Sequence, residues 1–405
     1  MLDPYQINLR HLNAVRAISE HGSLGRAAEA AFVSQPALTQ ALAKLERTLE
    51  APLFERHAAG MTPTPAGEVL ALRANRAFEH LAQASRLLHP AAGQRQGAPI
   101  HRYVTMAQLR AIITIVVQGG FAAAARAAGV SEPAMHRSAR ELERLAGLPL
   151  LVRRGRMIEP TPAAERFVQK ARLAVAEIAT LLSEIAALRG QGGGRIVIGA
   201  MSLARVRLAP LAIARTHALR PDVTFSIIDG PYYELLSKLR AGDVDIIVGA
   251  LRDPPPADDV VEEPLFVDHP VIAARAGHPL DGATAPNLAA LRPYPWIIAR
   301  EGAPLRRAWE EMFASADGQA PTVAVECGSM MAINTLLSDG DWLTLLLPEL
   351  IRREREAGRL TVIGPPITKA GLPIGLTTRR GWLPSAAQSL FIDVLRGMGS
   401  NAYGD

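Results

Sequence analysis

The N-terminal half of this chain contains the same pattern twice, at a constant offset of 97 residues and without a gap. The segment Ser34–Glu46 recurs as Ser131–Glu143, and Pro63–Ala66 recurs as Pro160–Ala163. An ungapped repeat of this length indicates a duplicated structural unit. A chain of 405 residues is too long for one hydrophobic core, so the two copies must be followed by at least one further domain.

Each copy has the pattern of a helix able to enter a groove of DNA. In the first copy Ser34 is a good N-cap, and Pro36 suits the first helical turn. Apolar residues follow at helical spacing, namely Leu38, Leu42 and Leu45. The other faces carry residues placed to meet base edges or phosphates, namely Gln35, Ala37, Thr39, Gln40 and Lys44. Considered alone, the segment favours an ordinary capped surface helix, but its repetition and flanks favour DNA binding.

The residues around this helix complete a helix-turn-helix pattern. Asn8–His21 is expected to be a helix that Gly22 ends, and Ser23 can cap a second helix. Small residues at Ala27–Ala28 allow neighbouring helices to approach closely. After the third helix, the short and turn-rich segment Pro52–Pro63 suits a two-stranded wing.

A long helix follows the wing in each copy, and both helices carry an apolar seam of the coiled-coil kind. The seam residues are Leu70, Ala74, Ala77, Leu81, Ala84 and Leu88 in the first copy, and Phe167, Ala171, Ala174, Ile178, Leu181, Ile185 and Leu188 in the second. We expect the two seams to pair within one chain. Pairing between chains and packing of each helix on its own domain are the alternatives. The segment His89–Val104, with its glycines and prolines, is expected to link the copies.

These motifs resemble the N-terminal domain of LysR-type transcriptional regulators. The residues that carry the resemblance are Gly22–Ser23, Ala27–Ala28, Ser34–Glu46, Pro52–Arg56 and Thr64–Gly67. The resemblance implies a winged helix-turn-helix domain that binds double-stranded DNA, here present twice. Together with the repeat, it assigns DNA contacts to Ser34, Gln35, Pro36, Ala37, Thr39, Gln40, Lys44 and Arg56, and to Ser131, Glu132, His136, Arg137, Arg140, Arg153, Arg154 and Arg156.

The second copy departs from the family pattern. It has Gly120 where the first copy has Ser23, which removes a cap, and Ala164 where the first has Gly67. Residues 96–190 carry 13 Lys and Arg against 7 Asp and Glu, whereas residues 191–405 carry 21 against 24. We therefore expect both copies to bind DNA, the second more through phosphates. The alternative is that one copy is only structural.

From Arg195 onward, after the Gly-rich hinge Gly190–Gly194, strand patterns alternate with helical ones, which is typical of an α/β domain. The expected strands are 195–200, 224–229, 244–251, 270–275, 296–300, 323–327, 342–347, 360–363 and 374–378. The motifs Ile196–Gly199, Leu239–Asp245 and Ala276–Leu280 resemble the effector domain of the same family, which is similar to type 2 periplasmic binding proteins. That resemblance implies two α/β lobes around a small-molecule cleft, with the chain crossing near Ala273 and returning near Leu347.

The fold class that follows is an α/β multidomain protein. Two tandem winged helix-turn-helix domains with long linker helices, at 1–92 and 100–190, precede a two-lobed effector domain at 195–400. Ligands in such sheets lie at the carboxyl ends of strands, near helix N-termini. The candidate effector residues are Met201, Ser202, Leu203, Gly230, Pro231, Ala250, Arg252, Glu301, Ser329 and Met330. Ser202 and Ser329 suit plain helix caps equally well, and Arg252 also suits a solvated loop.

The function that these patterns favour is a DNA-binding transcriptional regulator modulated by a small carboxylate, aromatic acids included, or by a sugar. An enzyme or solute-binding protein fused to DNA-binding domains, and an architectural DNA-binding protein, are the alternatives. No ordered catalytic set, cofactor motif or metal spacing is found. Cys327 is the only cysteine and no apolar run can span a bilayer, which fits a cytoplasmic protein without membrane contact. Homo-oligomers through linker helices and effector domains, and contact with RNA polymerase, are further expectations.

Overall fold

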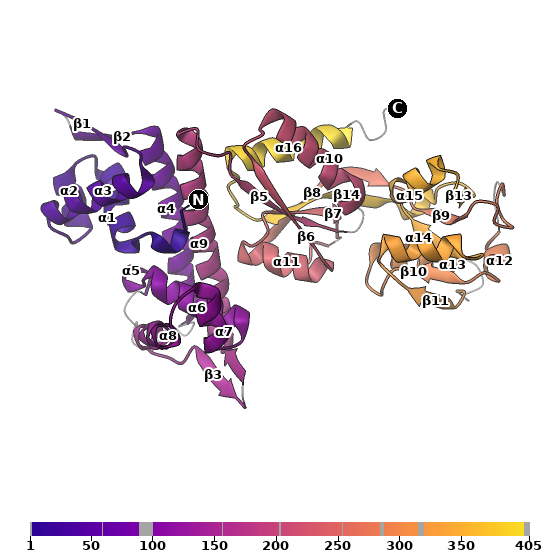
Figure 1. Cartoon of the computed structure of the whole chain (residues 1–405), viewed down its shortest axis with the longest axis horizontal. Coiled ribbons are helices and arrows are strands. Elements are labelled where there is room, and N and C mark those ends of the chain that lie inside the picture. The colour runs from indigo at the N-terminus through magenta and orange to yellow at the C-terminus, as the bar shows by residue number, and fades with distance from the viewer. Residues whose placement is uncertain are drawn as a thin grey trace. The chain divides into compact units, whose positions relative to one another are not determined.

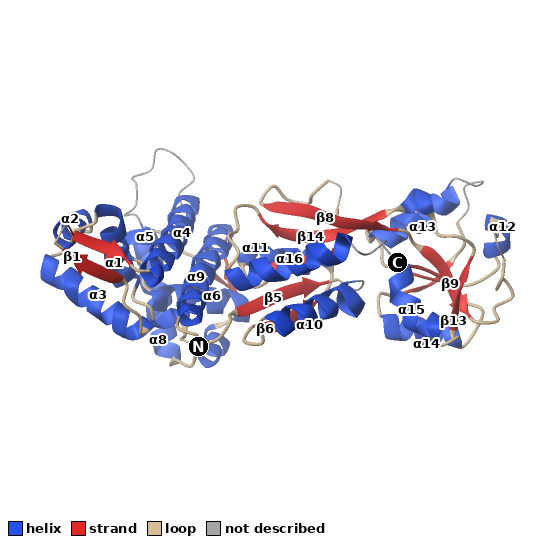
Figure 2. Cartoon of the chain, turned by 90° about the horizontal axis from the view of Figure 1, so that it is seen from above, coloured by secondary structure: helices blue, strands red, loops and turns tan. Residues whose placement is uncertain are grey.

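The computed structural model describes residues 2–58, 60–88, 100–155, 157–201, 204–252, 254–283, 287–314 and 320–400. They form two compact units. The first contains Met1–Arg195 with Asp222–Thr224 and Ala241–Asp243, and the second contains Ile196–Pro221, Phe225–Arg240 and Val244–Asp405. Each unit is described by itself (Figures 1 and 2). Within the described ranges, no helix is long and apolar enough to cross a membrane.

The first copy of the repeat folds as three short helices, a hairpin and a long helix. The elements are η1 (Pro4–Gln6), α1 (Leu9–His21), α2 (Leu24–Ala30), α3 (Gln35–Leu49), β1 (Phe54–His57), β2 (Gly60–Pro63) and α4 (Pro65–Leu88). Ser23 and Ser34 cap α2 and α3 as expected, and Asn8, which was expected to lie within the first helix, caps α1; each side chain accepts a bond from a first-turn N–H. Gly22 ends α1 in the left-handed conformation.

The second copy has the same order of elements. These are α5 (Ile100–Tyr103), α6 (Met106–Gln118), α7 (Phe121–Ala128), α8 (Glu132–Ala146), β3 (Leu151–Arg154), β4 (Met157–Pro160) and α9 (Pro162–Leu188). Gly120 makes no side-chain cap on α7, as its identity predicted. The expected linker His89–Val104 needs a correction, because Ile100–Tyr103 is a helical turn whose Ile100 is buried. The rest of that linker, residues 89–99, lies outside the described residues.

The seams of α4 and α9 pack against each other within the chain, as the sequence analysis expected (Figures 1 and 2). The two helices are antiparallel, since Arg73 near the start of α4 bonds to Glu184 near the end of α9. At the same end, Arg189 donates to the Leu49 carbonyl at 3.0 Å. The prediction that Leu188 belongs to the seam was wrong: this residue is 55% exposed, because α9 ends there. The packing joins the first copy and part of the second into one core, and residues of α6, α7 and α8 form a smaller separate core.

A charged cluster lies inside this apolar interface. The Arg73 side chain is 2% exposed. Its Nε and Nη2 donate to Glu184 at 2.8 and 2.7 Å, and its Nη1 donates to Glu177 at 3.1 Å. Arg76 Nε reaches the other oxygen of Glu177 at 2.7 Å. Burial alone would lower the pKa of Arg73, but the bonds and charges of Glu184 and Glu177 outweigh it and raise that pKa.

The second unit has two lobes, each built on a five-stranded sheet. The lobe 1 order is β6-β5-β7-β14-β8 and the lobe 2 order is β11-β10-β12-β9-β13. The lobe 1 elements are β5 (Arg195–Ala200), η2 (Ala204–Leu208), α10 (Ala209–Leu219), β6 (Thr224–Asp229), α11 (Tyr232–Ala241), β7 (Ile246–Ala250), β8 (Val260–Asp268), β14 (Leu372–Arg379) and α16 (Ala386–Ser400). The lobe 2 elements are β9 (Val271–Arg275), α12 (Leu288–Leu291), β10 (Trp296–Ile298), α13 (Pro304–Ala314), β11 (Val323–Glu326), α14 (Met330–Ser338), β12 (Leu343–Leu346), α15 (Pro348–Glu356), β13 (Leu360–Ile363) and η3 (Thr368–Ala370).

Two expectations about these lobes need correction. The chain does not return near Leu347: α15 and β13 still belong to lobe 2, where β13 pairs with β9, and the return comes just before β14. The strand β8 was missed altogether. It contains Pro264, which argues against a strand, but β8 is an edge strand and its register against β14 shifts at that residue.

The buried cluster generates a stability prediction. We expect Arg73→Ala to destabilise the first unit by about 3 kcal/mol, because it removes both bonds to Glu184 and one of the two arginines bonded to the buried Glu177. Replacing Arg73 together with both glutamates, as Arg73→Met with Glu177→Leu and Glu184→Leu, should restore most of that loss. The measurement is hydrogen exchange at α4 and α9 amides in the full chain. All four tryptophans lie beyond residue 195, so the urea concentration at which their fluorescence changes should be the same in the variants as in the wild type. Unchanged exchange in Arg73→Ala would contradict the prediction.

The one difference at the start of the long helices generates a second prediction. A Cβ on Gly67 would lie 2.0 Å from the Leu53 carbonyl oxygen. The second copy accommodates Ala164 at the equivalent position, where Thr161 Oγ1 is 3.4 Å from the Pro149 oxygen, against 2.6 Å for Thr64 and Pro52. Gly67→Ala should therefore cost roughly 1–3 kcal/mol, seen as faster exchange at the first turn of α4. The matched control, Ala164→Gly, should cost less than about 1 kcal/mol, and an equal effect would refute the explanation.

Candidate functional site

The exposed face of α3 carries the polar residues that the sequence analysis singled out. Ser34 Oγ accepts from the Ala37 N–H at 3.3 Å, which fixes the start of the helix. Gln35, Gln40 and Lys44 are exposed beside it. Thr39 is half-buried and its hydroxyl donates to the Gln35 carbonyl at 3.0 Å, so part of its hydrogen-bonding capacity is used within the helix. This face offers amide groups and one cation to a ligand.

The turn before α3 contains a residue that the sequence analysis did not single out. Phe32 has a φ of 55° and its side chain is 88% exposed. Bulky residues rarely adopt this conformation, and Gly129 occupies the same position in the second copy with a φ of 64°. Comparison of the two copies could have found this position, since a glycine in one copy marks a left-handed turn.

The exposed face of α8 differs in chemistry. Ser131 Oγ accepts from the Ala134 N–H at 3.4 Å, as Ser34 does in the first copy. Arg137 and Arg140 are exposed, and so is Glu132. His136 does not project freely: its ring stacks on Phe121 with centroids 3.6 Å apart, and its Nε2 lies 3.7 Å from Glu132. The face is therefore dominated by arginines.

The wings carry the remaining predicted contacts. Arg56 is exposed on β1. Arg153 donates to the Gly155 carbonyl at 3.1 Å, and Arg154 lies 3.2 Å from Glu159 across the second hairpin. Arg156 lies outside the described residues. Both hairpins precede a long helix, and because α4 and α9 are antiparallel they lie at opposite ends of that pair (Figure 1).

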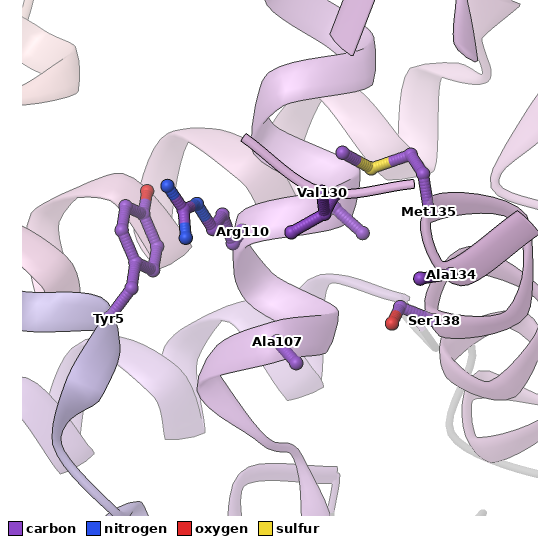
Figure 3. Close-up of a pocket in the computed structure, with 8 residues that line it drawn as sticks. Tyr5, Ala107, Arg110, Val130, Ala134, Met135 and Ser138 are labelled. Atoms are coloured by element: carbon purple, nitrogen blue, oxygen red, sulfur yellow. The ribbon is translucent and has the colours of Figure 1, made fainter. Parts of the chain in front are cut away.

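A cavity of about 180 Å³ lies beside α8 and was not anticipated (Figure 3). Tyr5 of η1 forms one wall and Arg110 of α6 the next, and Met135 and Ser138 of α8 face them. The Arg110 guanidinium lies 5.2 Å from the Tyr5 ring centre and 3.9 Å from Asp3. Burial is the main cause that raises the pKa of the Tyr5 phenol. The N-terminal arm of the first copy thus packs on the second copy.

The predicted effector residues of lobe 1 gather at the carboxyl edge of its sheet. Met201 follows β5 and donates its N–H to Val248 of β7 at 3.2 Å. The Met201 side chain fills the space beside Gly249. Pro231, after β6, accepts bonds from the first turn of α11. Ser202 and Leu203 lie outside the described residues.

Arg252 lies at the same edge in a polar cluster. Its N–H donates to Glu262 at 2.8 Å, its Nη1 donates to the Ala250 carbonyl at 3.2 Å, and its guanidinium lies 4.4 Å from the Tyr232 ring centre. The Tyr232 hydroxyl donates to the other oxygen of Glu262 at 2.8 Å. Glu262 was not predicted as a site residue, because its strand, β8, was not predicted either.

The electrostatics of this cluster combine one arginine with a carboxylate and a phenol. Burial lowers the pKa of Arg252, Tyr232 and Glu262 oppose that effect, and the charge of Arg307 on α13 lowers the pKa further. Burial and the bond to Glu262 raise the pKa of Tyr232, so its phenol remains neutral. A guanidinium stays charged at physiological pH. The cluster therefore holds one cation, Arg252, beside a phenol and a carboxylate.

The predicted residues of lobe 2 are placed more simply. Ser329 is exposed, and its hydroxyl accepts from the Ala332 N–H at 3.5 Å as the cap of α14. Met330 begins that helix, and Glu301 lies in the exposed turn after β10. Among the described residues, no group of three or more His, Cys, Asp or Glu side chains could hold a metal ion.

Family models match both parts of the chain. The model described as LysR substrate binding domain matches residues 189–400. The model described as bacterial regulatory helix-turn-helix protein, lysR family, matches twice, at residues 9–68 and 106–165. The HTH-type transcriptional regulator GalR of Pseudomonas putida is 34% identical over 396 residues, which cover 98% of both chains. The HTH-type transcriptional regulator CbbR of Rhizobium meliloti is 30% identical over 264 residues, 65% of this chain and 83% of its own.

Solved structures share the fold. A full-length OxyR variant from Pseudomonas aeruginosa is similar with a TM-score of 0.55 and 22% identity, over 73% of this chain and 95% of its own. CbnR, a LysR family transcriptional regulator, is similar with a TM-score of 0.51 and 22% identity, over 72% of this chain and 98% of its own. At this identity the likeness concerns the fold alone.

Proposed function

The chain belongs to the family of LysR-type transcriptional regulators, and on that premise we propose that both copies of its repeat are winged helix-turn-helix domains that bind DNA. The observation that carries the proposal is the exposed polar face of an N-capped helix in each copy. On α3 that face presents Gln35, Gln40 and Lys44, and on α8 it presents Arg137 and Arg140. Amides and guanidinium groups are the side chains that most often contact bases and phosphates.

In this proposal the two copies make different kinds of contact with DNA. The first copy contributes uncharged Gln35 and Gln40, which suit base edges. The second contributes Arg140 and the wing arginines Arg153 and Arg154, whose charges suit phosphates. Their bonds to Gly155 and Glu159 in the free protein hold them on the wing and can be exchanged for a phosphate.

The effector in this proposal is a small carboxylate bound at the carboxyl edge of lobe 1. Arg252 is the residue that supports this class of ligand, because it is a half-buried cation at the edge of the sheet where ligands lie in such folds. Arg252 stacks on the Tyr232 ring, and this arrangement leaves some of its guanidinium N–H donors for a carboxylate. The neighbouring Tyr232 ring suits an aromatic acid, and a carboxylate can form charge-assisted bonds to the guanidinium that a neutral sugar cannot form.

The remaining partners follow from this role. As a regulator rather than an enzyme, the protein works in the cytoplasm and RNA polymerase is a further partner. The seams of α4 and α9 are buried against each other within one chain. Oligomers would therefore form through the effector units instead of through these seams.

The base-contact proposal predicts a split between specific and random DNA. Gln35→Ala should weaken binding to the preferred site by about 5- to 150-fold, the value of one good base contact, and leave random DNA nearly unchanged. Fluorescence anisotropy of the full chain on both DNAs measures this. The matched control is Lys44→Ala on the same helix, which should weaken both DNAs alike and reduce the salt slope by about 0.9. An equal loss on both DNAs for Gln35→Ala would refute its role in reading sequence.

The effector proposal predicts a charge-dependent thermal shift. Benzoate and succinate serve as anionic probes, and glucose as the neutral one. An anionic probe should raise the melting temperature of the wild-type chain, and Arg252→Gln should weaken its binding by about 10- to 100-fold, as loss of a charge-assisted bond implies. The control is Arg240→Gln, whose arginine bonds Asp259 on lobe 1. A response to glucose alone, or an undiminished response in Arg252→Gln, would rule out this site for an anion.

A further inference from the structure

We propose that one chain recognises a bipartite DNA site whose two half-sites differ in sequence, α3 reading one and α8 the other. The inference rests on the proposed function, in which both copies bind DNA. It goes further because it names the class of DNA: an asymmetric site, in contrast to the palindrome that two identical recognition helices select.

The first step is that the two recognition helices are unlike at equivalent positions. The constant offset pairs Gln35 with Glu132 and Gln40 with Arg137, and all four side chains are exposed. The shared residues are those that shape the helix, such as the capping serines and the following prolines. The positions that build the helix are therefore alike, and the positions that face a ligand differ.

The second step is that unlike side chains prefer unlike bases. A glutamine pairs in bidentate fashion with adenine, an arginine with guanine, and a glutamate accepts from cytosine N4. Since Arg137 has the place on α8 that Gln40 has on α3, it is positioned for a base edge if both helices dock alike. We expect an A·T-containing half-site under α3 and a G·C-containing half-site under α8.

The third step is that the helix pair is built to hold unlike copies together. Arg73 and Arg76 of α4 meet Glu177 and Glu184 of α9. The offset shows that the second copy's counterpart of Arg73 is Lys170. The first copy's counterparts of the two glutamates are His80 and Leu87.

An α4 helix paired with the α4 of a second chain in this register would therefore bury Arg73 against His80 and Leu87, without a carboxylate. A buried charge without its counter-ion is strongly unfavourable. The α4–α9 pair provides both carboxylates, and the two helices are tethered in one chain, which raises their effective concentration. The charges thus select the pairing that joins α3 to α8.

The fourth step is geometric. Because α4 and α9 are antiparallel, the two copies are related by an approximate twofold axis, and their wings lie at opposite ends of the pair (Figure 1). Twofold-related recognition helices read two half-sites in opposite directions. With one helix from each copy, the site keeps the bipartite spacing of a dimer site but loses its sequence symmetry.

The experiment selects DNA from a random library with the full chain. Two variants with exchanged surface residues are run beside it: Glu132→Gln with Arg137→Gln on α8, and Gln35→Glu with Gln40→Arg on α3. All four positions are exposed, so the fold should persist, and circular dichroism checks this. The wild type should select two different half-sites. Each variant should change only its own half-site toward the sequence of the other, with a discrimination of about 5- to 150-fold at the changed base.

Three results would overturn the inference, and they separate it from the proposed function. An inverted repeat selected by the wild type would show that like copies pair on DNA, while both copies could still bind. A uniform loss of affinity in the α8 variant, with the selected sequence unchanged, would mean that Arg137 holds only phosphate. An α8 variant unchanged in both sequence and affinity would mean that the second copy does not contact DNA, and the proposed function itself would fail.

Discussion

The packing of α4 on α9 is the contact on which the first unit depends. The seam residues form one core with the first copy and with part of the second, and residues of α6, α7 and α8 form a smaller separate core. Burial of six or more apolar side chains on each helix supplies the favourable free energy. The cluster around Arg73 adds little net stability, because desolvation offsets most of the attraction, but it penalises every partner that lacks the two glutamates. The apolar seam thus supplies the stability of the helix pair, and the charged cluster around Arg73 favours α9 as the partner of α4.

The sequence predicted most of this fold because its signals are local or repeated. Caps such as Ser34 and Asn8, and the helices that they begin, follow from short-range rules. The repeat also supported each inference a second time, because a pattern that is ambiguous when it occurs once becomes specific when it recurs at equivalent positions. The strands of the second unit other than β8 were predicted within a few residues, because their apolar runs are short and bounded by turns.

What the sequence could not predict depends on contacts between distant segments. Pro264 argues against a strand, and only the bulge against β14 explains why β8 forms, so Glu262 and its bonds to Tyr232 and Arg252 stayed hidden. The Phe121 ring that holds His136 lies on the preceding helix, and its contact depends on the crossing angle of the two helices. The capping role of Ser329 was predicted, but no local rule separates a cap from a ligand contact.

The asymmetry of the two copies extends to the point where the chain leaves the first unit. Arg189, directly after α9, bonds the Leu49 carbonyl and the Glu50 carboxylate at the end of α3. Leu49 is among the last carbonyls of α3, where a cation is favourable. The glycines that follow Arg189 connect to the effector unit. The position equivalent to Arg189 in the first copy is Ala92, which has no guanidinium, so α3 has a direct side-chain link to this connection that α8 cannot share in the same way. The connection also continues directly from α9, which packs on α4 of the first copy and on α6 of the second.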